Sequence, residues 1–199
     1  MTESAPTMSQ TRLDVPRRDC SVGQPVPHLE IRIVDQDAEV APGGIGELWI
    51  RGPNVMRGYY RDPEQTRQAI NAEGWLNTGD LVRQDPDGAL FVVGRSKELI
   101  IRSGFNVYPV EVEQVLNSHP QVVHSAVVGR SVPNNEEVVA YVEAQPGSGL
   151  AVDALAEYLR ERLSAYKLPS EIIFLEHLPA TPTGKILKQQ LRQMAARHA

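Results

Sequence analysis

The chain has 199 residues, of which 41% are hydrophobic and 23% are charged, and its formal net charge is −5 at pH 7. This composition is typical of a globular protein with enough chain for two small domains. The acidic balance disfavours nucleic acid as a partner, and no apolar stretch is long enough to span a bilayer. The start has no apolar signal core, so we expect a cytoplasmic protein. Cys20 is the only cysteine and cannot form an internal disulfide.

The first half of the chain predicts short strands. Residues 1–27 are polar and rich in Ser, Thr, Pro and Arg, which indicates loop. Alternating apolar residues predict strands over 29–35 and 46–52. Asp62-Pro63 predicts the start of a helix, and Asp87-Gly88 predicts the turn of a hairpin. We therefore expect residues 28–94 to form a β-rich, barrel-like subdomain.

The second half predicts alternating helices and strands. A strand pair around Gly104 precedes a helix over 109–120, and two strands follow. A helix over 152–164 has an apolar stripe of Val152, Leu155, Leu159 and Leu163. A strand over 171–176 and a basic helix over 185–198 complete the chain. This order is an α+β layer sandwich, so we expect an α+β domain over 99–199, joined through a linker at 95–98.

A loop rich in Pro and Gly, 178–185, ends in Gly184-Lys185. Gly-Lys before a helix is typical of phosphate-binding loops, but such a loop needs another glycine where this chain has Pro179. A solvated lysine is therefore the simpler interpretation. It leaves a cation at a helix N-terminus, where the positive end of the helix dipole disfavours it. A bound anion would remove this conflict.

Two other polar stretches have a simple and a functional interpretation. Asp80, in a turn directly before a predicted strand, could accept hydrogen bonds from a sugar diol, although an ordinary Asx turn explains it as well. Arg95 and Lys97 lie at the expected boundary between the domains. Gly104 would let backbone approach a ligand closely, or it is simply a hairpin glycine beside a charged linker.

Four stretches gain meaning from their order: "GELWIRGPNVMRGYY", "GWLNTGDL", "GRSKELIIRSGFNVYPVEVE" and "LPATPTGKILKQQL". Together they resemble successive motifs of the acyl-adenylating superfamily, which contains acyl-CoA synthetases, luciferases and the adenylation domains of peptide synthetases. The resemblance is closest to fatty-acyl and aryl-CoA ligases, and it suggests a role in fatty acid metabolism. It implies that a carboxylate and ATP form acyl-AMP, that CoA then forms the thioester, and that the small C-terminal domain rotates between these steps.

The resemblance also implies roles for individual residues. Asp80 and Arg95 would hold the ribose hydroxyls, Lys97 would be the hinge, and Lys185 would be the catalytic lysine of adenylation. The CoA channel would be lined by Arg102, Ser103, Gly104 and Phe105. The chain departs from many relatives at Ile101, where some have a lysine, and at Lys188, where many have arginine.

The first residues resemble the end of a Tyr-Gly-x-Thr-Glu motif, which implies that Thr2 contacts the nucleotide phosphate and that Glu3 contacts Mg²⁺. We expect a C-terminal part of a longer ligase, frayed at its start and inactive alone, because no Gly-rich pyrophosphate loop is present. Two alternatives are an adenylation domain that loads a carrier protein and a non-catalytic nucleotide- or CoA-binding fragment. The resemblance further suggests that an acetyltransferase modifies Lys185 and thereby blocks adenylation.

Overall fold

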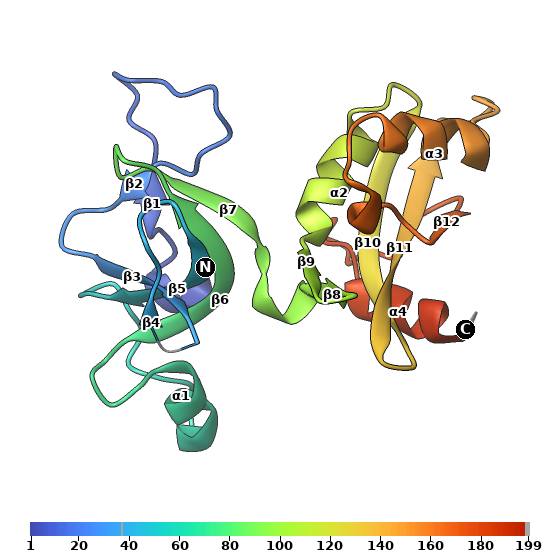
Figure 1. Cartoon of the computed structure of the whole chain (residues 1–199). Coiled ribbons are helices and arrows are strands. Elements are labelled where there is room, and N and C mark those ends of the chain that lie inside the picture. Colours follow the sequence, from blue (N-terminus) through green and yellow to red (C-terminus); the bar gives the residue numbers. More distant parts are fainter. Residues whose placement is uncertain (37, 198–199) are drawn as a thin grey trace. The chain divides into compact units, whose positions relative to one another are not determined.

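The computed structural model describes residues 1–36 and 38–197 and divides into two compact units, Met1–Lys97 and Glu98–Ala199. Figure 1 colours the first unit from blue to green and the second from green to red. Each unit is a separate fold with its own core, and both fit the predicted α+β class. None of the helices in the described residues is long and apolar enough to cross a membrane.

The first unit is built on a five-stranded sheet in the order β4-β3-β5-β6-β7. Its strands are β3 (Glu30–Asp35), β4 (Ala38–Glu39), β5 (Ile45–Arg51), β6 (Leu76–Gln84) and β7 (Leu90–Arg95), and every neighbouring pair is antiparallel. Leu48 and Ile50 on β5 are buried in the core, as the alternating pattern predicts. Within the described residues β4 and β7 are edge strands, so the sheet is open and does not close into a barrel.

The start of the chain is held in place. Thr2–Ser4 form a short 3₁₀ helix, and Ser4 is fully buried. The backbone N–H of Met56 donates to the Glu3 carbonyl at 2.8 Å, and the Asn54 amide donates to the Ser4 carbonyl at 3.1 Å. The expectation of a frayed start is therefore wrong in this structure, because residues some fifty positions later satisfy its backbone.

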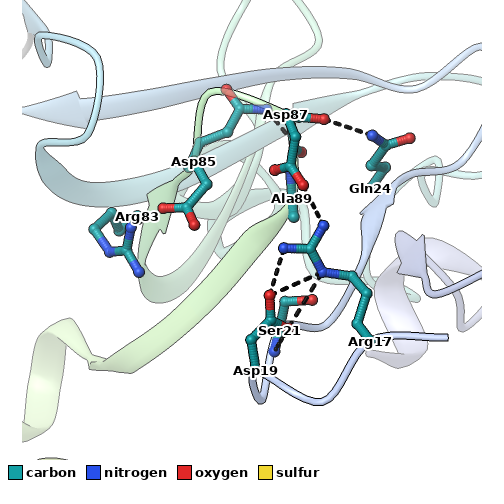
Figure 2. Close-up of polar contacts among 10 residues, drawn as sticks. Arg17, Asp19, Ser21, Gln24, Arg83, Asp85, Asp87 and Ala89 are labelled. Atoms are coloured by element: carbon teal, nitrogen blue, oxygen red, sulfur yellow. Dashed lines mark hydrogen bonds and ion pairs between the residues drawn. The ribbon is translucent and has the colours of Figure 1, made fainter. Parts of the chain in front are cut away.

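The long loop between β1 (Ser9–Gln10) and β2 (Gln24–Pro25) is tied to the β6–β7 turn. Figure 2 shows the Arg17 guanidinium between the carboxylates of Asp19 and Asp87. Gln24 adds a hydrogen bond to the Asp87 carbonyl at 2.5 Å. The hydrogen bond from Arg17 lowers the pKa of Asp19 to about 2.

Helix α1 (Pro63–Ala69) begins where the sequence predicts. The Asp62 side chain accepts a hydrogen bond from the Gln65 backbone N–H at 2.9 Å, and Pro63 occupies the first turn. An aspartate at the N-cap satisfies one backbone N–H that has no partner within the helix. Proline as the first helical residue loses no helical hydrogen bond, because the N–H at that position has no partner in the helix.

The second unit contains a three-stranded sheet in the order β10-β11-β12. β10 (Val122–Val132) and β11 (Asn135–Ala144) form a long antiparallel hairpin, whereas β12 (Glu171–Phe174) is parallel to β11. Parallel neighbours need a crossover, which α3 (Val152–Arg160) supplies. On the outer side of β10, the N–H of Val127 donates to a Glu113 carboxylate oxygen at 2.8 Å.

Alternate residues of this sheet build two cores on its opposite faces. On one face, Val127, Val138, Ala140 and Val142 pack with α2 (Pro109–Asn117) and α3. On the other face, Ala126, Val128, Val139 and Tyr141 pack with α4 (Lys188–Arg197). In the predicted stripe of α3, Leu155, Leu159 and Leu163 are buried, but Val152 in the first turn is 43% exposed.

The last helix starts later than predicted, at Lys188 instead of Lys185. Lys185 belongs to a tight hairpin: the Thr181 N–H donates to the Lys185 carbonyl at 2.8 Å, and Ala180 bridges Ile186. Gly184 closes the turn with φ +83°. Lys185 therefore does not lie at a helix N-terminus, and the predicted conflict with the helix dipole does not apply to it. His198, within the predicted helix, lies outside the described residues.

Candidate functional site

The backbone around Asp80 forms a bulge inside β6, not a turn before a strand as predicted. Glu47 pairs with Leu81 and Trp49 pairs with Asn77, so Thr78–Asp80 lie opposite a single residue of β5. Thr78 anchors the bulge, because its hydroxyl donates to the Leu48 carbonyl at 2.8 Å and accepts from the Asp80 N–H at 3.1 Å. Bulges commonly redirect a side chain next to a functional site, and the side chain redirected here is that of Asp80.

Asp80 and Arg95 lie opposite each other on β6 and β7 and form an ion pair. Arg95 Nε is 2.7 Å from Asp80 Oδ1; the Asp80 side chain is 12% exposed and that of Arg95 is 53% exposed. Burial raises the pKa of Asp80, while the positive charges of Arg95 and of the chain's amino group act in the opposite direction. A nearly buried carboxylate with one guanidinium partner suits hydrogen bonds from neighbouring hydroxyls of a ligand.

Thr2 and Glu3 lie on the same unit as Asp80. The Tyr59 hydroxyl donates to Glu3 Oε1 at 3.2 Å; burial, assisted by the charge of Glu3, raises the pKa of Tyr59. Thr2 is exposed. In residues 1–36 and 38–197 no group of three or more His, Cys, Asp or Glu side chains could hold a metal ion. Glu3 thus offers one carboxylate, and any Mg²⁺ here would take its other ligands from nucleotide oxygens or water.

The predicted CoA-contacting residues form the hairpin of β8 (Ile100–Arg102) and β9 (Phe105–Val107). Its two turn residues, Ser103 and Gly104, have φ values of +52° and +81°, which is typical of a two-residue hairpin turn. Arg102 Nη1 donates to the Leu168 carbonyl at 2.5 Å. The Phe105 ring stacks on Tyr166 with 4.8 Å between the ring centroids. The flanking side chains are thus fixed, and the turn itself is exposed.

Lys185 is exposed at the end of its hairpin turn, in the second unit. Its backbone N–H donates to the Thr181 hydroxyl at 3.1 Å. Among the residues that the structure describes, its ammonium group makes no ion pair, so the charge is available to a ligand. Lys97 is exposed in the short 3₁₀ helix Ser96–Glu98, at the division between the units.

Sequence reasoning did not single out one polar cluster. The Lys188 ammonium lies 2.7 Å from Glu98 Oε2 and 2.8 Å from Glu113 Oε1. A cation at the start of a helix is stabilised by a nearby anion, and this argument applies to Lys188, the first residue of α4, instead of Lys185. A correct prediction of where α4 begins would have pointed to Lys188.

Comparison with known proteins identifies the chain. Residues 1–60 match the AMP-binding enzyme family, and residues 111–185 match the AMP-binding enzyme C-terminal domain. A long-chain-fatty-acid–CoA ligase from Salmonella typhimurium is 42% identical over 196 residues, which cover 98% of this chain and 35% of the relative. The chain belongs to the AMP-binding enzyme family. The predicted family is thereby confirmed.

Two further relatives of this AMP-binding enzyme chain are informative. An indoleacetate–CoA ligase from Aromatoleum aromaticum is 42% identical over 199 residues, covering 98% of this chain and 39% of the relative. The crystal structure of ATP-bound MatB from Rhodopseudomonas palustris matches with a TM-score of 0.91 at 34% identity, over 98% of this chain and 39% of that protein. The chain thus spans well under half the length of each of these relatives.

Proposed function

We propose that this chain is the C-terminal part of an ATP-dependent ligase that forms acyl-AMP and then a CoA thioester from a fatty or aromatic carboxylate. The Asp80–Arg95 pair on the β6 bulge carries the proposal, because it presents a nearly buried carboxylate. Relatives named as long-chain-fatty-acid and indoleacetate CoA ligases support the reaction and both substrate classes. The solved relative that holds ATP supports the nucleotide.

In the proposed nucleotide site, Asp80 accepts hydrogen bonds from the two ribose hydroxyls. Arg95 adds a donor to the same sugar, and its positive charge favours the ionised form of the buried carboxylate. Thr2, exposed on the same unit, is proposed to contact a phosphate. Glu3 would contact Mg²⁺ together with phosphate oxygens or water.

Lys185 is proposed to act in the first step. A carboxylate oxygen attacks the α-phosphorus of ATP, the new P–O bond replaces the bond to pyrophosphate, and negative charge builds on the phosphate oxygens. The exposed Lys185 ammonium would bridge this phosphate and the attacking carboxylate. Removing one preorganised donor to a developing oxyanion typically costs about 10²- to 10³-fold in rate. Acetylation of Lys185 would remove the same charge.

The β8–β9 hairpin is proposed to act in the second step, after rotation at Lys97. The CoA sulfur attacks the acyl carbon, AMP leaves with the pair of electrons of the broken bond, and the thiol proton passes to solvent. The exposed turn at Ser103 and Gly104 would lie along the pantetheine chain. Arg102 and Phe105, fixed by residues 166–168, would keep the hairpin rigid.

A chimaera tests this proposal. The present chain replaces the matching 196-residue segment of the Salmonella ligase, and both half-reactions are measured separately. Lys185→Ala should slow pyrophosphate release by about 10²- to 10³-fold and spare thioester formation from supplied acyl-AMP. Arg160→Ala, on the exposed side of α3, is the matched control and should change neither. Equal loss of both half-reactions in Lys185→Ala would contradict the role of Lys185.

The chain by itself is proposed to be inactive, because it contains no Gly-rich pyrophosphate loop. The purified chain should release no pyrophosphate from ATP with fatty or aromatic acids. Robust turnover would refute this part of the proposal.

A further inference from the structure

Lys188 connects three separate segments of the second unit: the start of α4, helix α2 and Glu98, the first residue of the unit. Its ammonium contacts Glu98, at the end of the 3₁₀ helix Ser96–Glu98, and Glu113, on α2, while Lys188 itself begins α4. The three side chains are largely buried, with exposed fractions of 18%, 27% and 15% for Lys188, Glu98 and Glu113. Glu113 is fixed further by the N–H of Val127 on β10.

The charges of this cluster make Lys188 indispensable to it. Two carboxylates share one ammonium group, so loss of the ammonium would leave two largely buried negative charges close together. Breaking a buried pair by removing one partner is far more costly than losing an exposed pair. The two carboxylates also offset the unfavourable position of a cation at the start of α4.

The cluster lies at the base of the Lys185 hairpin. Between Lys185 and Lys188 the chain is fixed by the Ala180–Ile186 bridge and by the Leu187 N–H, which donates to the Pro179 carbonyl at 2.8 Å. Glu98 is the first residue of the second unit and directly follows Lys97. One ion pair thus joins the base of the Lys185 hairpin to the residue after the proposed hinge.

We propose that Lys188 is a positioning residue that joins the Lys185 hairpin and the start of the second unit into one rigid piece. Rotation at Lys97 then carries Lys185 along without loss of its placement. The inference rests on the proposed function for the roles of Lys185 and Lys97. The rigid connection through Lys188 does not depend on whether Lys185 takes part in catalysis.

Hydrogen–deuterium exchange of this chain tests the connection. Lys188→Met removes the charge and keeps the length, and it should accelerate exchange of the Thr181 and Leu187 amides about tenfold through local opening. Amides of β11 should be unchanged. Lys188→Arg is the conservative control and should behave as the wild type, because its guanidinium can serve both carboxylates. Glu98→Gln should also accelerate exchange of Leu187, although the two residues are far apart in sequence.

Two outcomes would overturn the inference. One is unchanged exchange in the Lys185 hairpin of Lys188→Met, and the other is equal acceleration throughout β10 and β11, which would indicate a merely structural role. In the chimaera, Lys188→Met should lower kcat for adenylation and leave KM for ATP unchanged. If the proposed catalytic role of Lys185 were wrong, Lys188→Met would still accelerate exchange in the Lys185 hairpin. Failure of the proposed function and failure of this inference can therefore be told apart.

Discussion

Replacing Tyr141 by phenylalanine is expected to stabilise the second unit. Tyr141 is fully buried on β11 beneath α4, and its hydroxyl has no hydrogen-bond partner in the described residues. Burial is the main cause that raises the pKa of Tyr141. A buried hydroxyl without a partner costs about 1–3 kcal/mol, whereas phenylalanine keeps the ring and its packing. We therefore expect the free energy of unfolding to rise by about 1 kcal/mol.

The same substitution should change the response to alkali. Because the pKa of Tyr141 is raised in the folded state, folding is favoured while the phenol is protonated. This contribution is complete below the ordinary tyrosine pKa of about 10 and is lost as the pH rises beyond it. The advantage of Tyr141→Phe over the wild type should therefore grow above about pH 10.

Urea denaturation of the whole chain provides an internal control. Both tryptophans, Trp49 and Trp75, belong to the first unit, so tryptophan fluorescence reports on that unit, whereas far-UV circular dichroism reports on both. In Tyr141→Phe the fluorescence midpoint should stay constant while the second unit's transition in circular dichroism moves to higher urea. A loss of about 1 kcal/mol or more would refute the reasoning, because the hydroxyl would then have a partner.

Two further predictions concern the β6 bulge. Gly79 has φ +69° and space for a Cβ atom, with Arg95 Nη1 4.0 Å away. Gly79→Ala should therefore destabilise the first unit by about 1 kcal/mol through backbone strain alone, measured by the same fluorescence-monitored denaturation. Gly79→Asn should cost less, because asparagine tolerates this conformation. Burial raises the pKa of Asp80, so the stability it contributes is present at acidic pH and is lost as the pH rises through its folded pKa. Asp80→Asn should remove this loss, and its urea midpoint should gain on the wild type as the pH rises towards neutral, while AMP binding measured by calorimetry falls. A midpoint difference that does not change with pH would contradict the assignment.

Elements with a strong local pattern were predictable from the sequence. Alternating residues identified β3 and β5, and an apolar stripe identified α3, because burial on one face imposes a period on the residues themselves. The start of α4 was predicted too early, because the chain just before it closes a tight hairpin. Hydrogen bonds between Thr181 and Lys185 and the Ala180–Ile186 bridge place Lys185 in this hairpin and not in the helix.

The candidate site was also predictable only in part. The sequence motifs identified the family and singled out Asp80 and Arg95, which form an ion pair in the structure. The bulge around Asp80 depends on a hydrogen bond between Thr78 and Leu48, from two different strands. The pair of Lys188 and Glu98 joins residues 90 positions apart. Contacts of this kind leave no periodic signal in the sequence, so only the folded chain reveals them.

The hydrogen bond between Val127 and Glu113 also bears on aggregation. β10 is an edge strand of its sheet, and the unpaired N–H groups of an exposed edge can pair with a strand of another molecule. Here the Glu113 carboxylate occupies the outward N–H of Val127, and α2 and α4 pack against the same strand. Another chain could pair with β10 at Val127 only by displacing the Glu113 carboxylate, so this side chain protects that part of the edge from strand-to-strand association.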